Sequence, residues 1–167
     1  SLPQPGQPLR DWQAVVIGGG LINGITQAGA WPHERILEVI VNDRELKARW
    51  EHSIRESFVM SDNKAVRNGT RYDALRMVAM AGWSAAEKTL TRYLASDVDA
   101  ELQMGAVSGT GDVPDPLATE ALIKAWPGLT ANNRKLALEA LLRSTSRRMA
   151  LQEAMRSGQI PEADIPP

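Results

Sequence analysis

The glycines between residues 18 and 24 have a type and spacing that could bind a dinucleotide. Gly18, Gly20 and Gly24 follow a short β-branched run at residues 14–17. In a dinucleotide-binding fold such a run is the first strand, and the glycines let the backbone approach a pyrophosphate at a helix N-terminus. Asp43 would then accept a hydrogen bond from a ribose hydroxyl. One hypothesis is therefore a nucleotide-binding, Rossmann-like enzyme.

Three features of the surrounding sequence count against that enzyme. Asn23 stands where the spacing needs a glycine, and Gly29 with Trp31-Pro32 would break the crossover helix. No further alternation of apolar strands with helices follows, although a parallel sheet needs it. We therefore favour a glycine-rich helix or turn whose bare backbone lets a neighbouring helix pack closely, with Asp11 as its N-cap.

The remaining side chains offer no catalytic or metal-binding pattern. The chain has no cysteine, which excludes disulfides, thiolate metal sites, cysteine nucleophiles and covalent haem attachment. His33 and His52 are the only imidazoles, and their spacing matches no metal-binding motif, so we expect both on the surface. No Gly-x-Ser-x-Gly sequence is present to form a nucleophile elbow. We predict that the chain is not an enzyme and uses no cofactor or metal.

Charge and hydropathy narrow the class of protein further. Nineteen basic and 20 acidic side chains give a net charge of −1, whereas nucleic-acid-binding proteins carry a basic surplus. Apolar residues make up 43% of the 167, which suffices for the core of one domain. No apolar run approaches the roughly 20 residues that span a bilayer. We expect neither a nucleic-acid partner nor membrane insertion.

Helical periodicity organises the chain from residue 43 onward. Asp43 is placed to cap a helix with an apolar stripe at every fourth residue, namely Leu46, Trp50, Ile54 and Phe58. Further cap and stop signals predict a series of short helices, which begin near Thr70, Ser84, Asp97, Asp115, Thr130 or Asn132, and Thr145 or Ser146. The inward faces of the last two would include Leu138, Leu141, Leu142 and Met149. These signals predict antiparallel helices joined by tight turns.

The predicted helices recur with similar apolar patterns. Residues 74–78 align with residues 103–107 and 137–141, at intervals of 29 and 34 residues. Two helices in about thirty residues are typical of an α-solenoid. We predict a single all-α, HEAT-like superhelix over residues 11–165, clearest over 70–160, after a Pro-rich arm or linker at 1–10. The Pro-rich start and the missing initiator Met also predict a module of a longer chain.

Charge is segregated in the C-terminal half. Residues 96–120 contain six acidic and no basic side chains, and residues 132–157 contain six basic against two acidic ones. These segments can complement each other between adjacent repeats, or they can steer a protein partner. Basic residues on the expected second helices form a candidate partner-binding stripe: Lys88, Arg92, Lys124, Arg147 and Arg156. We expect this stripe to bind an acidic surface of a neighbouring domain or a separate protein.

Three stretches of the chain resemble a known family. They are residues 31–36, residues 71–76 and, above all, residues 141–165 with their Gly-x-Ile-Pro-x-x-Asp-Ile ending. They resemble a HEAT-like segment of planctomycete and verrucomicrobial multidomain proteins of the membrane-bound dehydrogenase type, in which a β-propeller precedes the segment and a cytochrome c domain follows it. The family's catalytic and haem-binding residues lie outside this segment. The resemblance implies a scaffold or spacer within a larger bacterial redox protein, with an exported or periplasmic parent.

Overall fold

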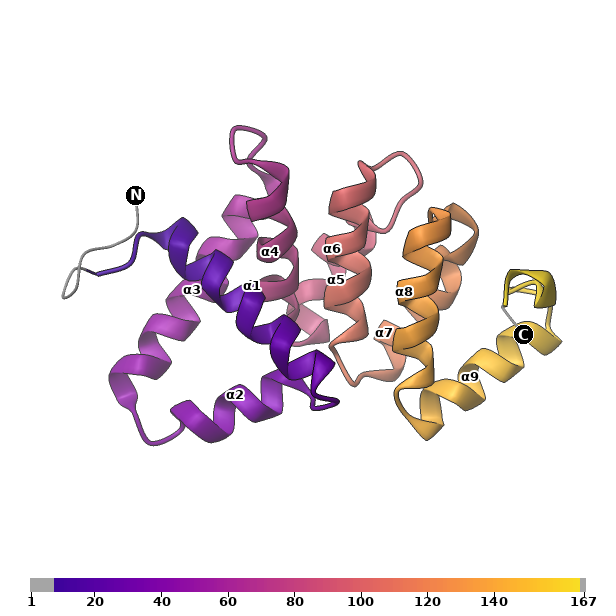
Figure 1. The fold of residues 1–167 in the computed structure, drawn as a ribbon, viewed down its shortest axis with the longest axis horizontal. Coiled ribbons are helices and arrows are strands. Elements are labelled where there is room, and N and C mark those ends of the chain that lie inside the picture. Colours follow the sequence, from indigo (N-terminus) through magenta and orange to yellow (C-terminus); the bar gives the residue numbers. More distant parts are fainter. Residues whose placement is uncertain (1–7, 166–167) are drawn as a thin grey trace.

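All regular secondary structure that the computed structural model describes, over residues 8–165, is helical (Figure 1). The α-helices are α1 (Asp11–Gln27), α2 (Pro32–Ile40), α3 (Arg44–Asp62), α4 (Asn68–Ala79), α5 (Trp83–Tyr93), α6 (Ala100–Gly111), α7 (Pro116–Ala125), α8 (Ala131–Leu142) and α9 (Thr145–Arg156). Short 3-10 turns cover Trp126–Gly128 and Glu162–Asp164. The predicted all-α class is therefore confirmed for this part of the chain. Residues 1–7 of the predicted arm lie outside the described residues, and residues 8–10 lead into α1 without regular structure.

Several helices begin at the capping residues that the sequence indicates. The Asp43 carboxylate accepts a 2.9 Å hydrogen bond from the Leu46 N–H and caps α3. Asp115 caps α7, with proline in the first turn where its missing N–H costs nothing. Thr130, one of the two predicted alternatives, caps α8. Local chemistry fixes these three boundaries.

Other predicted helix starts are displaced along the chain. Asp99 caps α6 in place of Asp97, and Ser144 caps α9 just before Thr145. The helices α1, α4 and α5 begin after Arg10, Arg67 and Gly82, and no side chain caps the last two. Gly82 has a φ of 84°, a conformation that glycine adopts readily and that directs the chain from α4 into α5.

The helices from α4 onward pack as successive pairs in two layers. α4, α6 and α8 lie side by side in one layer (Figure 1), while α5 contacts α7 and α7 contacts α9 in the other. Within each pair the second helix packs against the first. α1 and α3 both pack on α4, and α2 touches α1 and α3. The first three helices therefore form one end of the molecule, and α9 lies toward the other (Figure 1).

The apolar core runs through these layers, and it corrects two sequence predictions. Leu138 and Leu141 are buried in α8, as predicted. Leu142 and Met149 were predicted to face inward, but they are 47% and 64% exposed. The prediction for Met149 was wrong because the buried face of α9 consists of Arg147, Leu151 and Ala154. A buried arginine gives no apolar signal in the sequence. Leu142 ends α8 and lies outside its buried face, which includes Leu138 and Leu141.

The helix α3 also packs differently from the apolar stripe predicted for it. Leu46 is 42% exposed, and Trp50, Ile54 and Phe58 are only partly buried. Its most buried residues are instead the small ones at the same spacing, Ser53, Ser57 and Ser61. Each serine hydroxyl donates to a carbonyl of its own helix, so burial leaves no hydroxyl unpaired. Small, internally satisfied side chains let a neighbouring helix approach closely.

Candidate functional site

The glycine segment lies in the middle of α1, so the strand that the dinucleotide-binding hypothesis needs is not formed. A β-carbon on Gly18 would overlap the Met77 side chain of α4, while Gly20 and Gly24 face open space. The backbone amides of this segment are engaged in the helix and are not presented to a phosphate. The prediction of a strand was wrong, and the favoured alternative of a glycine-rich helix in close packing is confirmed. Asp43, the proposed ribose ligand, caps α3.

The two histidines lie on the surface, as predicted, and each contacts one partner. His33 Nδ1 lies 3.0 Å from the Met80 carbonyl oxygen, and His52 Nε2 lies 2.9 Å from Asp11 Oδ1. Within residues 8–165, no three His, Asp or Glu side chains gather where they could hold a metal ion. None of the described helices is long and apolar enough to cross a bilayer.

The candidate basic stripe does not form a continuous exposed surface. Arg147 is only 3% exposed, so its assignment as a partner-binding residue was wrong. Arg92 pairs with Asp62 at 2.5 Å, and Arg156 pairs with Glu153 at 2.5 Å, both at the surface. Lys88 and Lys124 are exposed, and no ion pair within the described residues includes them. Two unpaired lysines remain of the five predicted cations.

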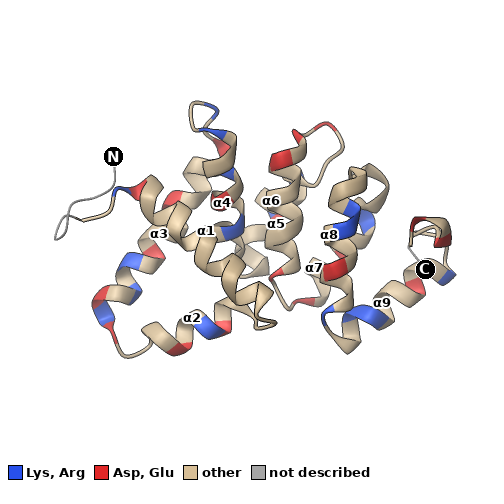
Figure 2. Ribbon diagram, in the orientation of Figure 1, with Lys and Arg blue, Asp and Glu red and all other residues tan. Residues whose placement is uncertain are grey.

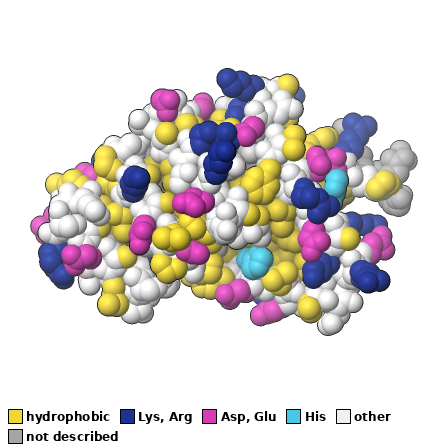
Figure 3. Space-filling view, turned by 180° about the vertical axis from the view of Figure 1, so that it is seen from behind, with side chains coloured by type: hydrophobic (Ala, Val, Ile, Leu, Met, Phe, Trp, Pro, Cys, Tyr) yellow, Lys and Arg dark blue, Asp and Glu magenta, His cyan; other side chains and the backbone are white. Residues whose placement is uncertain are grey.

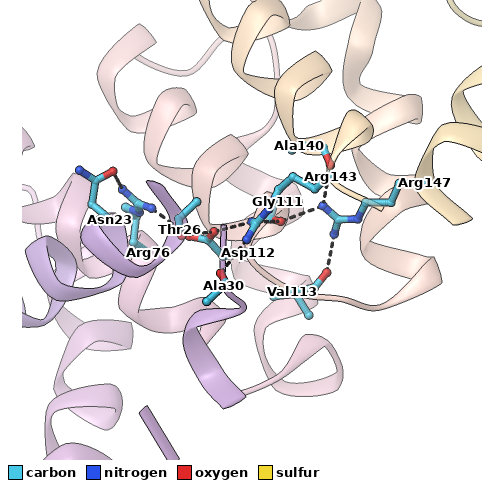
Figure 4. Close-up of polar contacts among 10 residues, drawn as sticks. All are labelled: Asn23, Thr26, Ala30, Arg76, Gly111, Asp112, Val113, Ala140, Arg143 and Arg147. Carbon is cyan, nitrogen blue, oxygen red and sulfur yellow. Dashed lines mark hydrogen bonds and ion pairs between the residues drawn. The ribbon is translucent and has the colours of Figure 1, made fainter. Parts of the chain in front are cut away.

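A buried polar cluster is centred on the carboxylate of Asp112, at the end of α6 (Figure 4). This carboxylate accepts hydrogen bonds from Arg76 at 2.9 Å, from Arg143 at 2.9 Å and from the Thr26 hydroxyl at 2.6 Å. Its side chain and that of Arg76 are 1% and 4% exposed. Arg76 also donates to Asn23 Oδ1 at 2.7 Å. Side chains from four helices, α1, α4, α6 and α8, therefore meet at the Asp112 carboxylate.

The indole of Trp31 extends this cluster toward α9. The Arg143 and Arg147 guanidinium carbons lie 4.2 and 5.2 Å from the centre of the indole ring, which stabilises both cations. Arg143 also donates to the Ala30 carbonyl at 3.0 Å. Arg147 donates to the carbonyls of Gly111, Val113 and Ala140. Burial and the nearby Arg143 charge lower the pKa of Arg147 to about 10, so it stays charged at neutral pH.

These contacts make the cluster a structural clamp between distant helices. Asp112 belongs to the acidic segment and Arg143 to the basic one, so their pairing accounts for part of the charge segregation. A carboxylate that is almost fully enclosed by protein donors has no free oxygen to offer a substrate. The cluster therefore holds the first two helices against α6, α8 and α9.

A groove between α5 and α7 carries charge of both signs. Its volume is about 620 Å³, and its walls include Leu94, Leu117 and the buried Trp83. Glu87, Glu120 and Lys124 also line it. Figure 3 shows the face of the molecule opposite to that of Figure 1, where apolar side chains are exposed among charged ones. Two of the charged side chains that line the groove are acidic. The groove therefore does not favour the acidic partner that was expected for the basic stripe.

The clearest apolar hollow lies among α1, α2 and α3, and we call it the N-terminal basin. It has a volume of about 470 Å³ and is lined by apolar side chains from all three helices, with Arg35, Arg49 and Ser53 as the polar exceptions. Ile17, Leu21, Val39 and Leu46 line it and are 56%, 49%, 67% and 42% exposed. Each of the three helices therefore presents at least one large apolar side chain of the basin to solvent.

Exposed large apolar side chains concentrate at this end of the chain. Eight of the 12 in the described residues fall between residues 9 and 46: Leu9, Trp12, Ile17, Leu21, Leu37, Val39, Val41 and Leu46. Charged residues of both signs occur along α2 and α3 (Figure 2). No sequence motif predicted a function for these exposed apolar residues. The available signal was α2 itself, whose short sequence carries more apolar residues than one buried face requires.

No family model matches this chain, and comparisons with curated proteins and with solved structures gave no match.

Proposed function

We propose that this chain is a non-catalytic, HEAT-like helical-repeat scaffold that binds a polypeptide partner through the N-terminal basin. The observation that carries the proposal is the concentration of exposed large apolar side chains around one hollow. Soluble proteins seldom expose contiguous apolar patches, and those that do commonly use them to bind other proteins. Isolated exposed residues such as Val59 and Leu117 do not have this meaning.

The succession of helix pairs supports the scaffold part of the proposal. Helices α4, α6 and α8 in one layer and α5, α7 and α9 in the other are the arrangement expected of stacked repeats. The Asp112 clamp ties the basin helices to this stack, so a bound partner is held in a fixed position. By the resemblance to HEAT-like segments of bacterial redox proteins, the partner is a neighbouring domain of a parent chain or a separate protein.

The basin replaces the basic stripe as the partner-binding surface in this proposal. Arg147 belongs to the clamp, and Arg92 and Arg156 have acidic neighbours on the surface. Burial of apolar surface contributes about 25 cal/mol per Å², whereas exposed charges contribute little to affinity one at a time. Lys88 and Lys124 then serve as control positions outside the basin.

A site-specific photo-crosslinker tests the proposed surface in the cells that make the protein. The crosslinking residue is placed at Val39, which is 67% exposed in the basin, and in a second variant at Lys88. We expect a discrete cross-linked polypeptide from position 39 and none from position 88. Equal cross-linking from the two positions, or none from position 39, would contradict binding through the basin.

A further inference from the structure

Each wall of the N-terminal basin repeats apolar side chains at the spacing of a helix. Ile17, Leu21 and Ile25 follow one another along α1, and Leu46 and Trp50 do so along α3. Side chains in such rows form ridges, and the grooves between them accept the ridges of another helix. The α1 row from residue 14 to residue 25 spans about 16 Å, which corresponds to about three helical turns of an occupant.

Both charged residues that line the basin are arginines. Arg35 from α2 and Arg49 from α3 line it, and no acidic residue is among the residues that form its walls. Their guanidinium groups interact with Glu38 and Glu45 of their own helices, where all four side chains are well exposed. Exposed pairs of this kind are weak, so a carboxylate of an incoming chain can displace or share them. The basin therefore favours an occupant with acidic residues beside its apolar surface.

We propose that the occupant of the N-terminal basin is an amphipathic helix whose apolar stripe is flanked by acidic residues that pair with Arg35 and Arg49. This inference rests on the proposed function, because it specifies the partner of the same surface. The apolar stripe fills the hollow among Ile17, Leu21 and Val39, while the acidic flanks meet Arg35 of α2 and Arg49 of α3. Hydrophobic contact supplies the affinity, and the charges select the partner and its register.

Two other occupants fit the observations less well. A second copy of this chain that met basin to basin would offer Arg35 and Arg49 no carboxylate from its own basin lining. A lipid surface would meet the rim of a hollow of about 470 Å³ without filling it. Both remain measurable outcomes of the experiment below.

A displayed library of amphipathic helices tests the occupant directly. Library members carry a fixed leucine stripe over four turns, and their flanking positions are randomised among Glu, Lys, Gln and Ser. The whole chain is the bait, and members that also bind a Leu21→Glu, Val39→Glu variant are removed. We expect the selected helices to be enriched in Glu at the flanks, with Lys depleted.

Paired charge variants supply the matched control. Arg35→Glu with Arg49→Glu should weaken binding of a selected helix at least tenfold and reverse the preference of the library toward Lys. Lys88→Glu with Lys124→Glu makes the same change in net charge away from the basin and should leave binding unchanged. Because all four side chains are exposed, folding is expected to survive and is checked by circular dichroism.

The possible outcomes separate the two proposals. Helices that bind the basin with neutral or basic flanks would overturn the acidic occupant but leave the basin as a binding surface. If no library member remains after those that bind the Leu21→Glu, Val39→Glu variant are removed, both proposals fail. Sedimentation that shows a dimer dissociated by Val39→Glu, or binding to phosphatidylserine vesicles lost in the same variant, would assign the basin to a second copy or to lipid and overturn the helix.

Discussion

The side chain of Asp73 in α4 occupies the space that a β-carbon on Gly19 of α1 would fill. An added β-carbon would lie 2.7 Å from Asp73 Cβ and 2.8 Å from its carboxyl carbon, well inside van der Waals contact. Gly19 is buried, and Asp73 is partly buried beside it. Together with the contact between Gly18 and Met77, this contact limits how closely α1 approaches α4, and α1 forms one wall of the N-terminal basin.

Gly19→Ala should destabilise the protein, because the new methyl group must push α1 away from Asp73. Overpacking of this kind costs about 1–3 kcal/mol. Gly20→Ala is the matched control, since nothing lies within 4 Å of a β-carbon there, and alanine should add about 0.5–1 kcal/mol of helix stability. Urea unfolding measures both changes. Destabilisation of equal size at the two positions would refute the close packing of α1 on α4.

The stability of the protein should depend on the ionisation of Asp73. Burial, together with the nearby Glu101 charge, outweighs the effect of Arg76 and raises the Asp73 pKa from 3.8 to about 6. The folded chain thus binds the Asp73 proton more tightly than the unfolded chain does. The stability that this proton contributes is present at low pH and is lost as pH rises through 6. Asp73→Asn stays neutral and should gain stability over the wild type between about pH 4 and pH 7.

Melting temperatures of both proteins across that pH range check the Asp73 prediction. The difference between variant and wild type should widen as the carboxyl group ionises. Parallel curves would mean that the Asp73 carboxyl group ionises alike in the folded and unfolded chains.

Asp112→Ala should be among the most destabilising single substitutions. It leaves the guanidinium groups of Arg76 and Arg143 without their shared carboxylate in a buried site, which costs about 3–5 kcal/mol. The control is Glu153→Gln, which breaks an exposed pair with Arg156 and should cost less than about 1 kcal/mol. Guanidinium-free chemical unfolding, for example in urea, compares the two without screening the ion pairs. A loss below 1 kcal/mol for Asp112→Ala would show that water reaches the cluster.

Leu141→Ala should destabilise the C-terminal helix pair by about 2–5 kcal/mol, because it removes a side chain with 0% exposure. Met149→Ala removes a side chain that is 64% exposed and should change stability by less than about 0.5 kcal/mol. The pair of midpoints in urea distinguishes the buried from the exposed faces of α8 and α9. Similar midpoint shifts for the two variants would contradict the exposed position of Met149 on α9.

The sequence by itself determined the helical class and the features that depend on a few adjacent residues. Asp43 and Asp115 cap helices because their carboxylates reach amides within the next turn. The interpretation of the glycine segment as a close-packed helix was correct at Gly18, which meets Met77, whereas Gly20 and Gly24 face open space. Neither inference needed to know which helix lies alongside.

The tertiary structure alone decided which arginines are buried and where the apolar surface lies. Arg143 donates to the carbonyl of Ala30, which is 113 residues earlier in the chain. Arg147 lies over the indole of Trp31, the residue after Ala30. A guanidinium can be buried only where remote carbonyls, a carboxylate and an aromatic ring converge on it, and no local pattern encodes that convergence. The basin likewise exists because α1, α2 and α3 leave a hollow among them, so residues such as Ile17 and Val39, apolar like any core residue, stay exposed.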